Sequence, residues 1–283
     1  MTRIHSGRTP GAAPRKAVPK KKLFVASYGL TPVAQMTFES IDALRSCGVV
    51  YSGSVDAMTT KSVHGLGIPL VSLANPGPCG LLEKVLRAFK KNDRVGVLFY
   101  GNPLFLNQQM SELLHAVSRL AEVEVVPGVS SFDMLINLFG MTRLSEKGLF
   151  IADLNFFMED PKFTPGPDIF FFAPFRLNAP DCGKFKAGFI KALSGKYARR
   201  FPAYLVKCDS NPARVEVIKG CMSCLPALME RCGKQHTLVI FSEGRLSSID
   251  NPPPWLRFTA RSVCDCDQRP AGPVRPARPS RQP

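Results

Sequence analysis

Short apolar runs alternate with amphipathic segments along the first half of the chain, and this alternation limits the possible folds more than any other feature. Leu23–Ser27, Val49–Ser52, Val95–Tyr100 and Glu122–Val126 have the length and apolar content of strands. Segments with apolar residues at helical spacing lie between these runs. A repeated strand–helix order indicates a mostly parallel sheet with helices on both faces, so we predict an α/β fold.

A second α/β unit with shorter elements is predicted after Gly140. Strands are expected at Asp168–Ala173, Ala203–Lys207 and Thr237–Phe241, and a helix at Lys184–Leu193. Two α/β domains would leave a cleft between them, which is a common place for a ligand. The predicted division is a disordered basic tail over 1–22, an N-terminal domain over 23–140, a connection over 141–167, a C-terminal domain over 168–245 and a mostly irregular Pro/Arg-rich tail over 246–283.

The net charge of +15 comes largely from the two ends of the chain. Residues 1–22 hold seven Lys/Arg and no acid, and residues 264–283 add a further +2, so the folded middle carries only about +6. The basic tails keep RNA as a possible partner. No apolar run approaches the ~18–20 residues that span a bilayer. We expect a soluble, cytoplasmic protein with no membrane partner.

Three of the predicted strands end in loops that contain glycine: Tyr28-Gly29, Tyr100-Gly101-Asn102-Pro103 and Pro127–Ser131. In a parallel sheet these loops gather at the carboxyl ends of the strands, where ligands bind. Glycine lets a ligand approach the backbone without meeting a Cβ. None of the three is a G-x-G-x-x-G or phosphate-binding P-loop, which argues against a dinucleotide or nucleoside-triphosphate enzyme.

One group of residues has a loosely zinc-like spacing: Cys221, Cys224, Cys232 and His236. Apolar residues such as Met222, Leu225 and Met229 lie between them at helical spacing. This pattern favours thiols that pack along a helix, and we predict no metal site.

Three segments resemble the tetrapyrrole methylases, the class III S-adenosylmethionine-dependent methyltransferases. Leu23–Ser52 is similar to the opening strand, glycine loop, threonine-capped helix and second strand of that family. Val95–Leu106 resembles its strand and Gly-Asp-Pro or Gly-His-Pro loop, and Val125–Asp133 matches its Pro-Gly-Val-Ser-Ser segment. The Tyr-Gly-Asn-Pro segment and the aromatic strand of the second half look closer to the branch that methylates peptide backbone amides. That branch has a helix with tyrosine and arginine before the Tyr-Gly-Asn-Pro strand, whereas Gly77–Phe89 contains only Arg87 and no tyrosine.

The resemblance implies a two-domain fold with S-adenosylmethionine as cofactor in the cleft, a homodimer, and a small-molecule methyl acceptor such as a tetrapyrrole. Methyl transfer from a sulfonium needs in-line positioning more than acid–base groups. Tyr28 and Tyr100 are the candidates for orienting the acceptor. The residues that the resemblance places at the cofactor are Tyr100, Gly101, Asn102, Pro103, Ser130, Ser131, Phe172, Ala173, Pro174, Ser210, Asn211, Pro212, Ala213 and Thr237.

Two other functions are compatible with the sequence. One branch of the family methylates ribosomal RNA, and the basic tails would suit that acceptor. The other is a cofactor-binding or scaffold module without catalysis. Asn102 stands where many relatives have Asp, and the first loop is Ser-Tyr-Gly-Leu instead of Gly-x-Gly-Pro. Both departures support the non-catalytic alternative.

Overall fold

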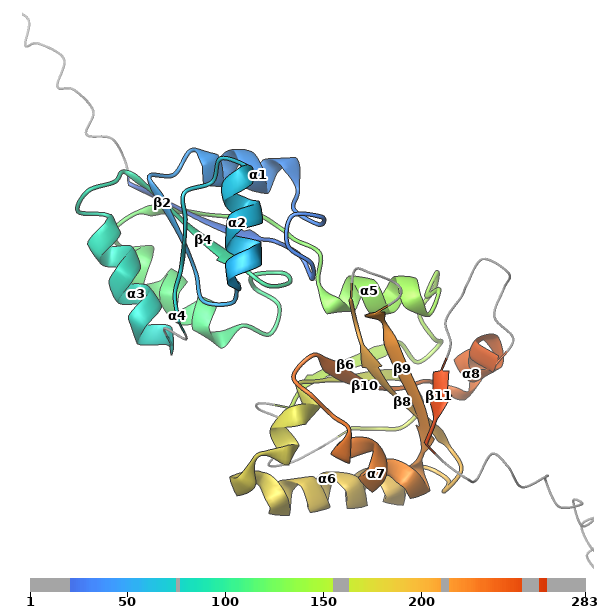
Figure 1. Cartoon of the computed structure of the whole chain (residues 1–283). Coiled ribbons are helices and arrows are strands. Elements are labelled where there is room, and N and C mark those ends of the chain that lie inside the picture. The colour runs from blue at the N-terminus through green and yellow to red at the C-terminus, as the bar shows by residue number, and fades with distance from the viewer. Residues whose placement is uncertain (1–20, 75–76, 155–162, 210–213, 251–259, 264–283) are drawn as a thin grey trace, which may run out of the picture. The chain divides into compact units, whose positions relative to one another are not determined.

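The computed structural model describes residues 21–74, 77–154, 163–209, 214–250 and 260–263. The predicted tails over 1–20 and 264–283 therefore lie outside the described residues. The described chain forms two compact units (Figure 1). The first unit contains residues 21–26, 37–99 and 107–127, and the second contains 27–36, 100–106 and the described residues from 128 onward.

The first unit is built on a five-stranded sheet in the order β3-β2-β4-β1-β5. Its elements in chain order are β1 (Lys22–Ser27), α1 (Phe38–Arg45), β2 (Val49–Ser52), α2 (Ala57–Gly65), β3 (Leu70–Ser72), α3 (Gly77–Ala88), β4 (Arg94–Phe99), α4 (Gln108–Val117) and β5 (Glu122–Val125). β2 pairs in parallel with β3 and β4, and β1 pairs in parallel with β5. Thr37 caps α1 by accepting a hydrogen bond from Ser40 N at 3.1 Å.

The core of the first unit lies between its sheet and the helices α3 and α4. Leu23, Val25, Val95 and Val97 come from the central strands and are fully buried. They pack with apolar residues at helical spacing in the two helices: Leu81, Val85, Ala88, Met110, Leu113 and Val117. The periodicity that predicted these helices therefore corresponds to the face that the sheet covers.

The second unit is built on a six-stranded mixed sheet in the order β11-β9-β8-β10-β7-β6. Its elements in chain order are α5 (Ser131–Leu138), β6 (Leu149–Asp153), β7 (Asp168–Phe172), η1 (Pro174–Asn178), η2 (Pro180–Cys182), α6 (Gly183–Lys196), β8 (Pro202–Lys207), β9 (Glu216–Cys221), η4 (Met222–Cys224), α7 (Leu225–Glu230), β10 (His236–Ile240), α8 (Glu243–Asp250) and β11 (Ala260–Ser262). β10 is antiparallel to β7 and β8, whereas β6 is parallel to β7.

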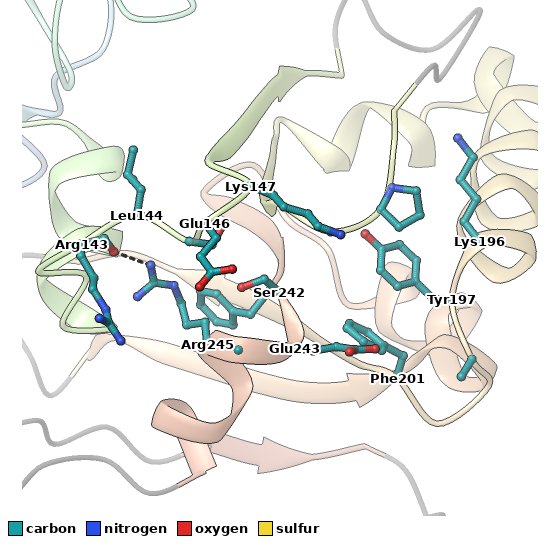
Figure 2. Close-up of a pocket in the computed structure, with 16 residues that line it drawn as sticks. Arg143, Leu144, Glu146, Lys147, Lys196, Tyr197, Phe201, Ser242, Glu243 and Arg245 are labelled. Atoms are coloured by element: carbon teal, nitrogen blue, oxygen red, sulfur yellow. Dashed lines mark hydrogen bonds between the residues drawn. The ribbon is translucent and has the colours of Figure 1, made fainter.

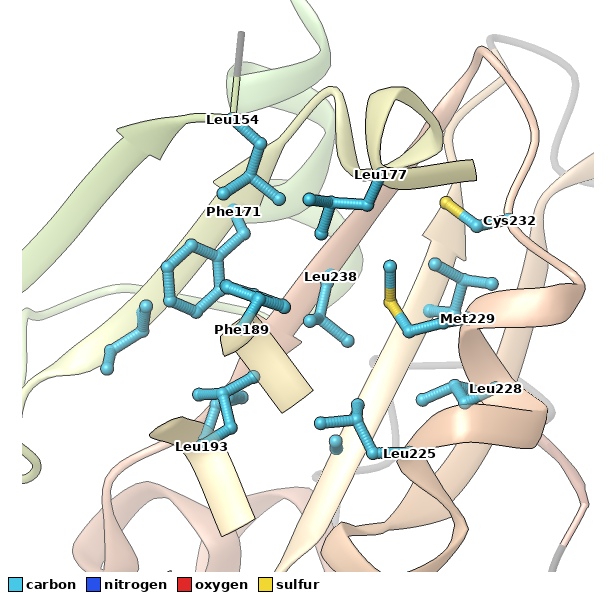
Figure 3. Packing of buried hydrophobic residues seen from close by; sticks show 14 of the residues in the cluster. Leu154, Phe171, Leu177, Phe189, Leu193, Leu225, Leu228, Met229, Cys232 and Leu238 are labelled. Carbon is cyan, nitrogen blue, oxygen red and sulfur yellow. The ribbon is translucent and has the colours of Figure 1, made fainter. Parts of the chain in front are cut away.

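Helices cover both faces of this sheet, and strand β7 is therefore buried along its whole length. Ile169 and Phe171 point to the face covered by α6 and α7, where they pack with Phe189, Leu193 and Leu225 (Figure 3). Phe170 and Phe172 point to the opposite face, which carries α5. Successive strand side chains alternate between faces, so a strand buried on both sides is apolar throughout.

The structure differs from the predicted division in two places. Helix α5 and the three glycine loops are grouped with the second unit, although they follow strands of the first. Within the predicted tail over 246–283, the described residues include the end of α8 and strand β11, which pairs in parallel with β9. The described part of that region is therefore regular.

The segment from Cys221 to Cys232 is not the single helix that its spacing suggested. Cys221 is the last residue of β9, where it lies opposite Pro202, and Cys224 lies in η4. Helix α7 begins only at Leu225, with Pro226 in its first turn, and ends before Cys232. The pairing of β9 with β8 keeps the first cysteine in the sheet. No helix among the described residues is long and apolar enough to cross a membrane.

Candidate functional site

The loops that follow β1, β4 and β5 contact one another within the second unit. Gly101 N donates a hydrogen bond to Gly29 O at 2.9 Å, which joins the first loop to the second. A Cβ on Gly128 would lie only 2.1 Å from Ser27 Cβ, so the third loop packs closely against the end of β1. The three loops that the sequence singled out are therefore brought together.

The first loop is closed by Gln35, a residue that the sequence analysis did not identify. Gln35 Oε1 accepts hydrogen bonds from Leu30 N at 2.7 Å and Thr31 N at 3.4 Å. Ser27 Oγ accepts from Gly29 N at 2.8 Å. Gly29 has a φ of +73°, and a Cβ there would meet Gln35 Cβ at 2.4 Å. Only glycine fits this turn. The turn fixes the position of the Gly29 carbonyl, which accepts the hydrogen bond from Gly101 N.

The second loop turns at Gly101 and Asn102. Gly101 has a φ of +65°, and the nearest atom to a Cβ there would be Ser130 Cα at 4.0 Å. Asn102 Oδ1 accepts a hydrogen bond from Leu104 N at 3.0 Å. An aspartate would accept the same bond, so the asparagine preserves the local turn and removes only the charge. Pro103, the next residue, is buried.

Ser130 and Ser131 begin helix α5 at the end of the third loop. Ser130 is 5% exposed and forms a capping box with Asp133. Its N and Oγ both donate to Asp133 Oδ2 at 2.7 Å. The Ser130 amide and hydroxyl both bond to Asp133, so we assign Ser130 the role of holding the loop in position. Ser131 O accepts a weak hydrogen bond from Cys208 Sγ at 3.8 Å, which connects the loop to the end of β8.

The predicted residues of the second half lie at one edge of the second sheet. Phe172 ends β7 and lies directly opposite Thr237 of β10. Ala173 adopts a left-handed conformation with a φ of +54°, and the buried Pro174 begins η1. Phe105 of the second loop packs edge-on against Phe172 with ring centroids 5.0 Å apart. This contact brings the glycine loops to that edge. Ser210, Asn211, Pro212 and Ala213 lie outside the described residues.

Tyr28 and Tyr100 form a perpendicular pair within the loop cluster. Their ring centroids are 6.1 Å apart at an interplanar angle of 69°. Tyr28 is 3% exposed, whereas Tyr100 is 36% exposed. Burial raises the pKa of the Tyr100 phenol well above its ordinary value, and Cys208, Tyr28 and Asp209 act in the same direction. Tyr100 is therefore protonated at neutral pH and can act as a hydrogen-bond donor.

Phe105, Cys208 and Asp209 reach the loop cluster from positions that the sequence analysis did not select. Phe105 is two residues after the Gly-Asn-Pro motif, and it could have been found as the apolar residue of that loop. Cys208 and Asp209 follow β8, a strand-end position like those of the glycine loops, but without a glycine. Within the described ranges, no cluster of three or more His, Cys, Asp or Glu residues could hold a metal ion.

The comparison with protein families gives one match. The sequence model described as Tetrapyrrole (Corrin/Porphyrin) Methylases matches residues 22–143. This range contains all three glycine loops and helix α5. No curated protein matches the sequence.

Solved structures with the same fold include three of methyltransferases. Uroporphyrin-III-C-methyltransferase from Thermus thermophilus aligns with a TM-score of 0.60 and 20% identity, over 83% of this chain and 97% of that one. The cobalamin biosynthetic enzyme cobalt precorrin-4 methyltransferase, CbiF, aligns with a TM-score of 0.56 and 16% identity, over 78% and 94%. A uroporphyrin-III C-methyl transferase from Thermus thermophilus complexed with S-adenyl homocysteine aligns with a TM-score of 0.56 and 17% identity, over 78% and 92%.

Proposed function

We propose that the chain is an S-adenosylmethionine-dependent methyltransferase whose acceptor is a small molecule of the tetrapyrrole class, because the tetrapyrrole methylase family model matches residues 22–143. The observation that carries this proposal is the joining of the glycine loops to one another and to Phe172 at the edge of the second sheet. The fold, shared with uroporphyrin-III and cobalt precorrin-4 methyltransferases, supports the same conclusion.

The residues at this edge fit the two parts of S-adenosylmethionine. Beside Gly101 the backbone carries no side chain, and a Cβ there would touch only Ser130 Cα at 4.0 Å, so the space suits the methionine part. We assign that part to Gly101, Asn102, Pro103 and Ser131. The adenosine part is assigned to the segment after β7 and to β10, through Phe172, Ala173, Pro174 and Thr237.

The cofactor supplies a methyl group on a sulfonium, which transfers by direct displacement. The contribution of this chain is to hold the acceptor in line and to keep water out of the site. Tyr100 is the residue we assign to the acceptor, because its phenol is protonated and part of it is exposed. Tyr28 supports the Tyr100 ring from a buried position. An orienting hydrogen bond from Tyr100 would favour an acceptor with a carboxylate or carbonyl oxygen near the reacting carbon.

The cofactor assignment is tested by calorimetric titration with S-adenosylmethionine and, separately, S-adenosylhomocysteine. We expect micromolar binding of both, abolished by Gly101→Trp because the indole would fill the space beside the loop. Gly188→Trp is the matched control: Gly188 lies on α6, and a Cβ there meets nothing within 4 Å. Absence of binding to the folded wild-type protein would contradict the proposal and favour a non-catalytic scaffold.

The acceptor is tested separately, in protein that binds the cofactor. Release of S-adenosylhomocysteine should depend on added tetrapyrrole, and Tyr100→Phe should lower its rate without abolishing cofactor binding. Turnover with RNA and none with tetrapyrroles would instead support the ribosomal RNA alternative. We also propose that the protein is a cytoplasmic homodimer, as the family resemblance suggests. A monomeric mass in sedimentation equilibrium would exclude the dimer.

A further inference from the structure

A cavity of about 650 Å³ lies in the second unit, and no residue of the glycine loops lines it (Figure 2). Its walls come from the segments before β6 and β7, the end of α6 and the segment after β10. β10 and β7 are antiparallel, with Thr237 opposite Phe172 at one end and Ile240 opposite Ile169 at the other. At about 3.3 Å per residue, the lengths of these strands separate the cavity from Phe172 by roughly 15 Å.

A buried ion pair holds the walls of this cavity together. Asp168, at the start of β7, is fully buried and accepts hydrogen bonds from Ser242 N at 2.9 Å and Arg245 Nε at 2.6 Å. Arg245 also donates to Arg143 O, which fixes the segment before β6 (Figure 2). Asp168 and Arg245 together thus join three segments that are far apart in sequence, so the cavity is part of the folded framework.

Two hydroxyl groups of the cavity walls have no hydrogen-bond partner in the part of the chain that the structure describes. Tyr197 Oη and Ser242 Oγ are both buried, and neither meets an acceptor or donor within the described ranges. Ser242 is 8% exposed as a residue. Burial raises the pKa of Tyr197 to about 12, so its hydroxyl is a donor at neutral pH. Buried polar groups are normally hydrogen-bonded, so two unsatisfied donors in one cavity indicate a missing acceptor.

The charged side chains of the cavity restrict what this acceptor can be. Lys147 extends toward Tyr197, and its stem lies against Gly166, where a Cβ would meet Lys147 Cδ at 2.6 Å. Lys147 forms no ion pair among the residues that the structure describes. The other charged residues of the lining are Arg143, Lys196, Arg245, Glu146 and Glu243. Because Arg245 is paired with Asp168, the remaining lining charges, with Lys147, sum to +1. One negative charge, placed at Lys147, is the arrangement that these side chains favour.

Aromatic rings form the remaining wall. Tyr197 and Phe201 pack with centroids 4.8 Å apart at 41°, and both line the cavity. Such a surface binds an apolar or aromatic ligand body, while a few polar groups fix its orientation.

We propose that this cavity is a second ligand site, for a small organic monocarboxylate with an apolar or aromatic body. The carboxylate accepts hydrogen bonds from Lys147 Nζ and from the hydroxyls of Tyr197 and Ser242. The ring or chain of the ligand packs on Tyr197 and Phe201. The site is independent of the proposed cofactor site, because the two lie at opposite ends of β7 and β10.

Ligand-observed NMR of the full-length protein with benzoate tests this proposal. We expect saturation transfer from the wild-type protein to benzoate at millimolar concentrations. Lys147→Met should weaken binding about 10-fold through loss of the charge-assisted bond. Tyr197→Phe, which removes only the unpartnered hydroxyl, should weaken it roughly 3-fold or more. Lys191→Met, on the exposed part of α6 and outside the cavity, should leave binding unchanged.

Three results would overturn the proposal, provided that thermal unfolding shows each variant to be folded. One is the absence of benzoate binding to the wild-type protein. Another is equal binding by the wild-type protein, Lys147→Met and Tyr197→Phe. The last is displacement of benzoate by S-adenosylhomocysteine, which would place the probe in the cofactor site. Inorganic phosphate should compete poorly, because it has no apolar body to pack on Tyr197 and Phe201 and the unpaired charges of the lining sum to only +1; strong competition would contradict the predicted chemistry of the ligand.

Discussion

At the scale of single residues, the candidate site depends on backbone conformations that most amino acids avoid. Gly29 and Gly101 both have positive φ values, and a hydrogen bond joins them. Ala173, after β7, has a φ of +54° although it is not glycine. Such conformations persist only where the surrounding structure enforces them, and they concentrate at functional sites. Here Gln35 and the Gly101 amide hold the turn at Gly29, and the Ala173 carbonyl accepts a hydrogen bond from Arg176 N at 3.1 Å.

Gly29→Ala should destabilise the protein by roughly 1–3 kcal/mol, because it adds a Cβ at a positive φ and against Gln35. Cofactor binding should weaken as well, since the loop holds Gly101 through its carbonyl. The free energy of unfolding in urea and the calorimetric titration measure the two effects. Gly188→Ala on α6 is the control, and it should be neutral or slightly stabilising. Equal effects of both variants would contradict the role of the turn.

The raised pKa of Tyr100 predicts a pH dependence of stability. The unfolded chain releases the Tyr100 proton near its ordinary pKa of about 10, whereas the folded protein retains it to higher pH. Its contribution to stability is therefore fully present below about pH 10 and is lost as the pH rises further. Unfolding measured between pH 8 and pH 11 should show a smaller decline for Tyr100→Phe than for the wild-type protein. Identical declines would mean that the folded structure does not raise the pKa of the Tyr100 phenol.

At the scale of elements, helix ends and strand ends determine where the functional side chains lie. The capping box of Ser130 and Asp133 fixes the start of α5 at the third glycine loop. The pair of Asp168 and Arg245 fixes the start of α8 against the start of β7. The capping box lies beside the proposed cofactor site, and the ion pair lies beside the proposed monocarboxylate site. The capping box joins residues three positions apart, whereas the ion pair joins residues 77 positions apart.

Ser130→Ala should cost about 1 kcal/mol of stability, the usual value of a lost helix cap. The effect should fall greatly in a protein that already carries Asp133→Ala, because the two side chains cap the helix together. Urea unfolding of the single and double variants gives the coupling energy. Additive effects would show that the capping box does not act as a unit.

Asp168→Ala should be far more disruptive, by about 3–5 kcal/mol, because it leaves the Arg245 guanidinium buried without its partner. The double variant Asp168→Ala, Arg245→Met should recover part of this loss, since no unpaired charge remains. Thermal and chemical unfolding provide the comparison. As a control, Glu124→Gln at the partly exposed ion pair with Lys22 should change stability little. A small effect at Asp168 would contradict its structural role.

At the scale of the whole molecule, the two units contribute differently to the proposed site. The first unit supplies three strands whose ends lead into the loops, whereas the loops themselves group with the second unit. A cofactor bound by these loops must therefore stabilise the second unit directly. The second unit also contains the proposed monocarboxylate site, so ligands at either place should act on the same sheet.

A saturating cofactor should raise the midpoint of thermal unfolding. At a concentration 100-fold above Kd, binding to the folded state alone contributes about 2.7 kcal/mol. S-adenosylhomocysteine is the suitable ligand, because it cannot transfer a methyl group during the scan. Gly101→Trp should show no shift, and Gly188→Trp should behave like the wild-type protein. A shift in Gly101→Trp would move the cofactor site away from the glycine loops.

The sequence by itself determined the α/β class, the positions of most strands and helices, and the three glycine loops, because burial imposes local periodicity and tight turns require glycine. The tertiary structure alone decided which distant residues meet. Phe105 contacts Phe172, Cys208 reaches Ser131, and Asp168 pairs with Arg245. The antiparallel position of β10 carries no local signature either. Such contacts depend on strand order and on chain reversals over 60 residues or more, which the pattern of neighbouring residues does not encode.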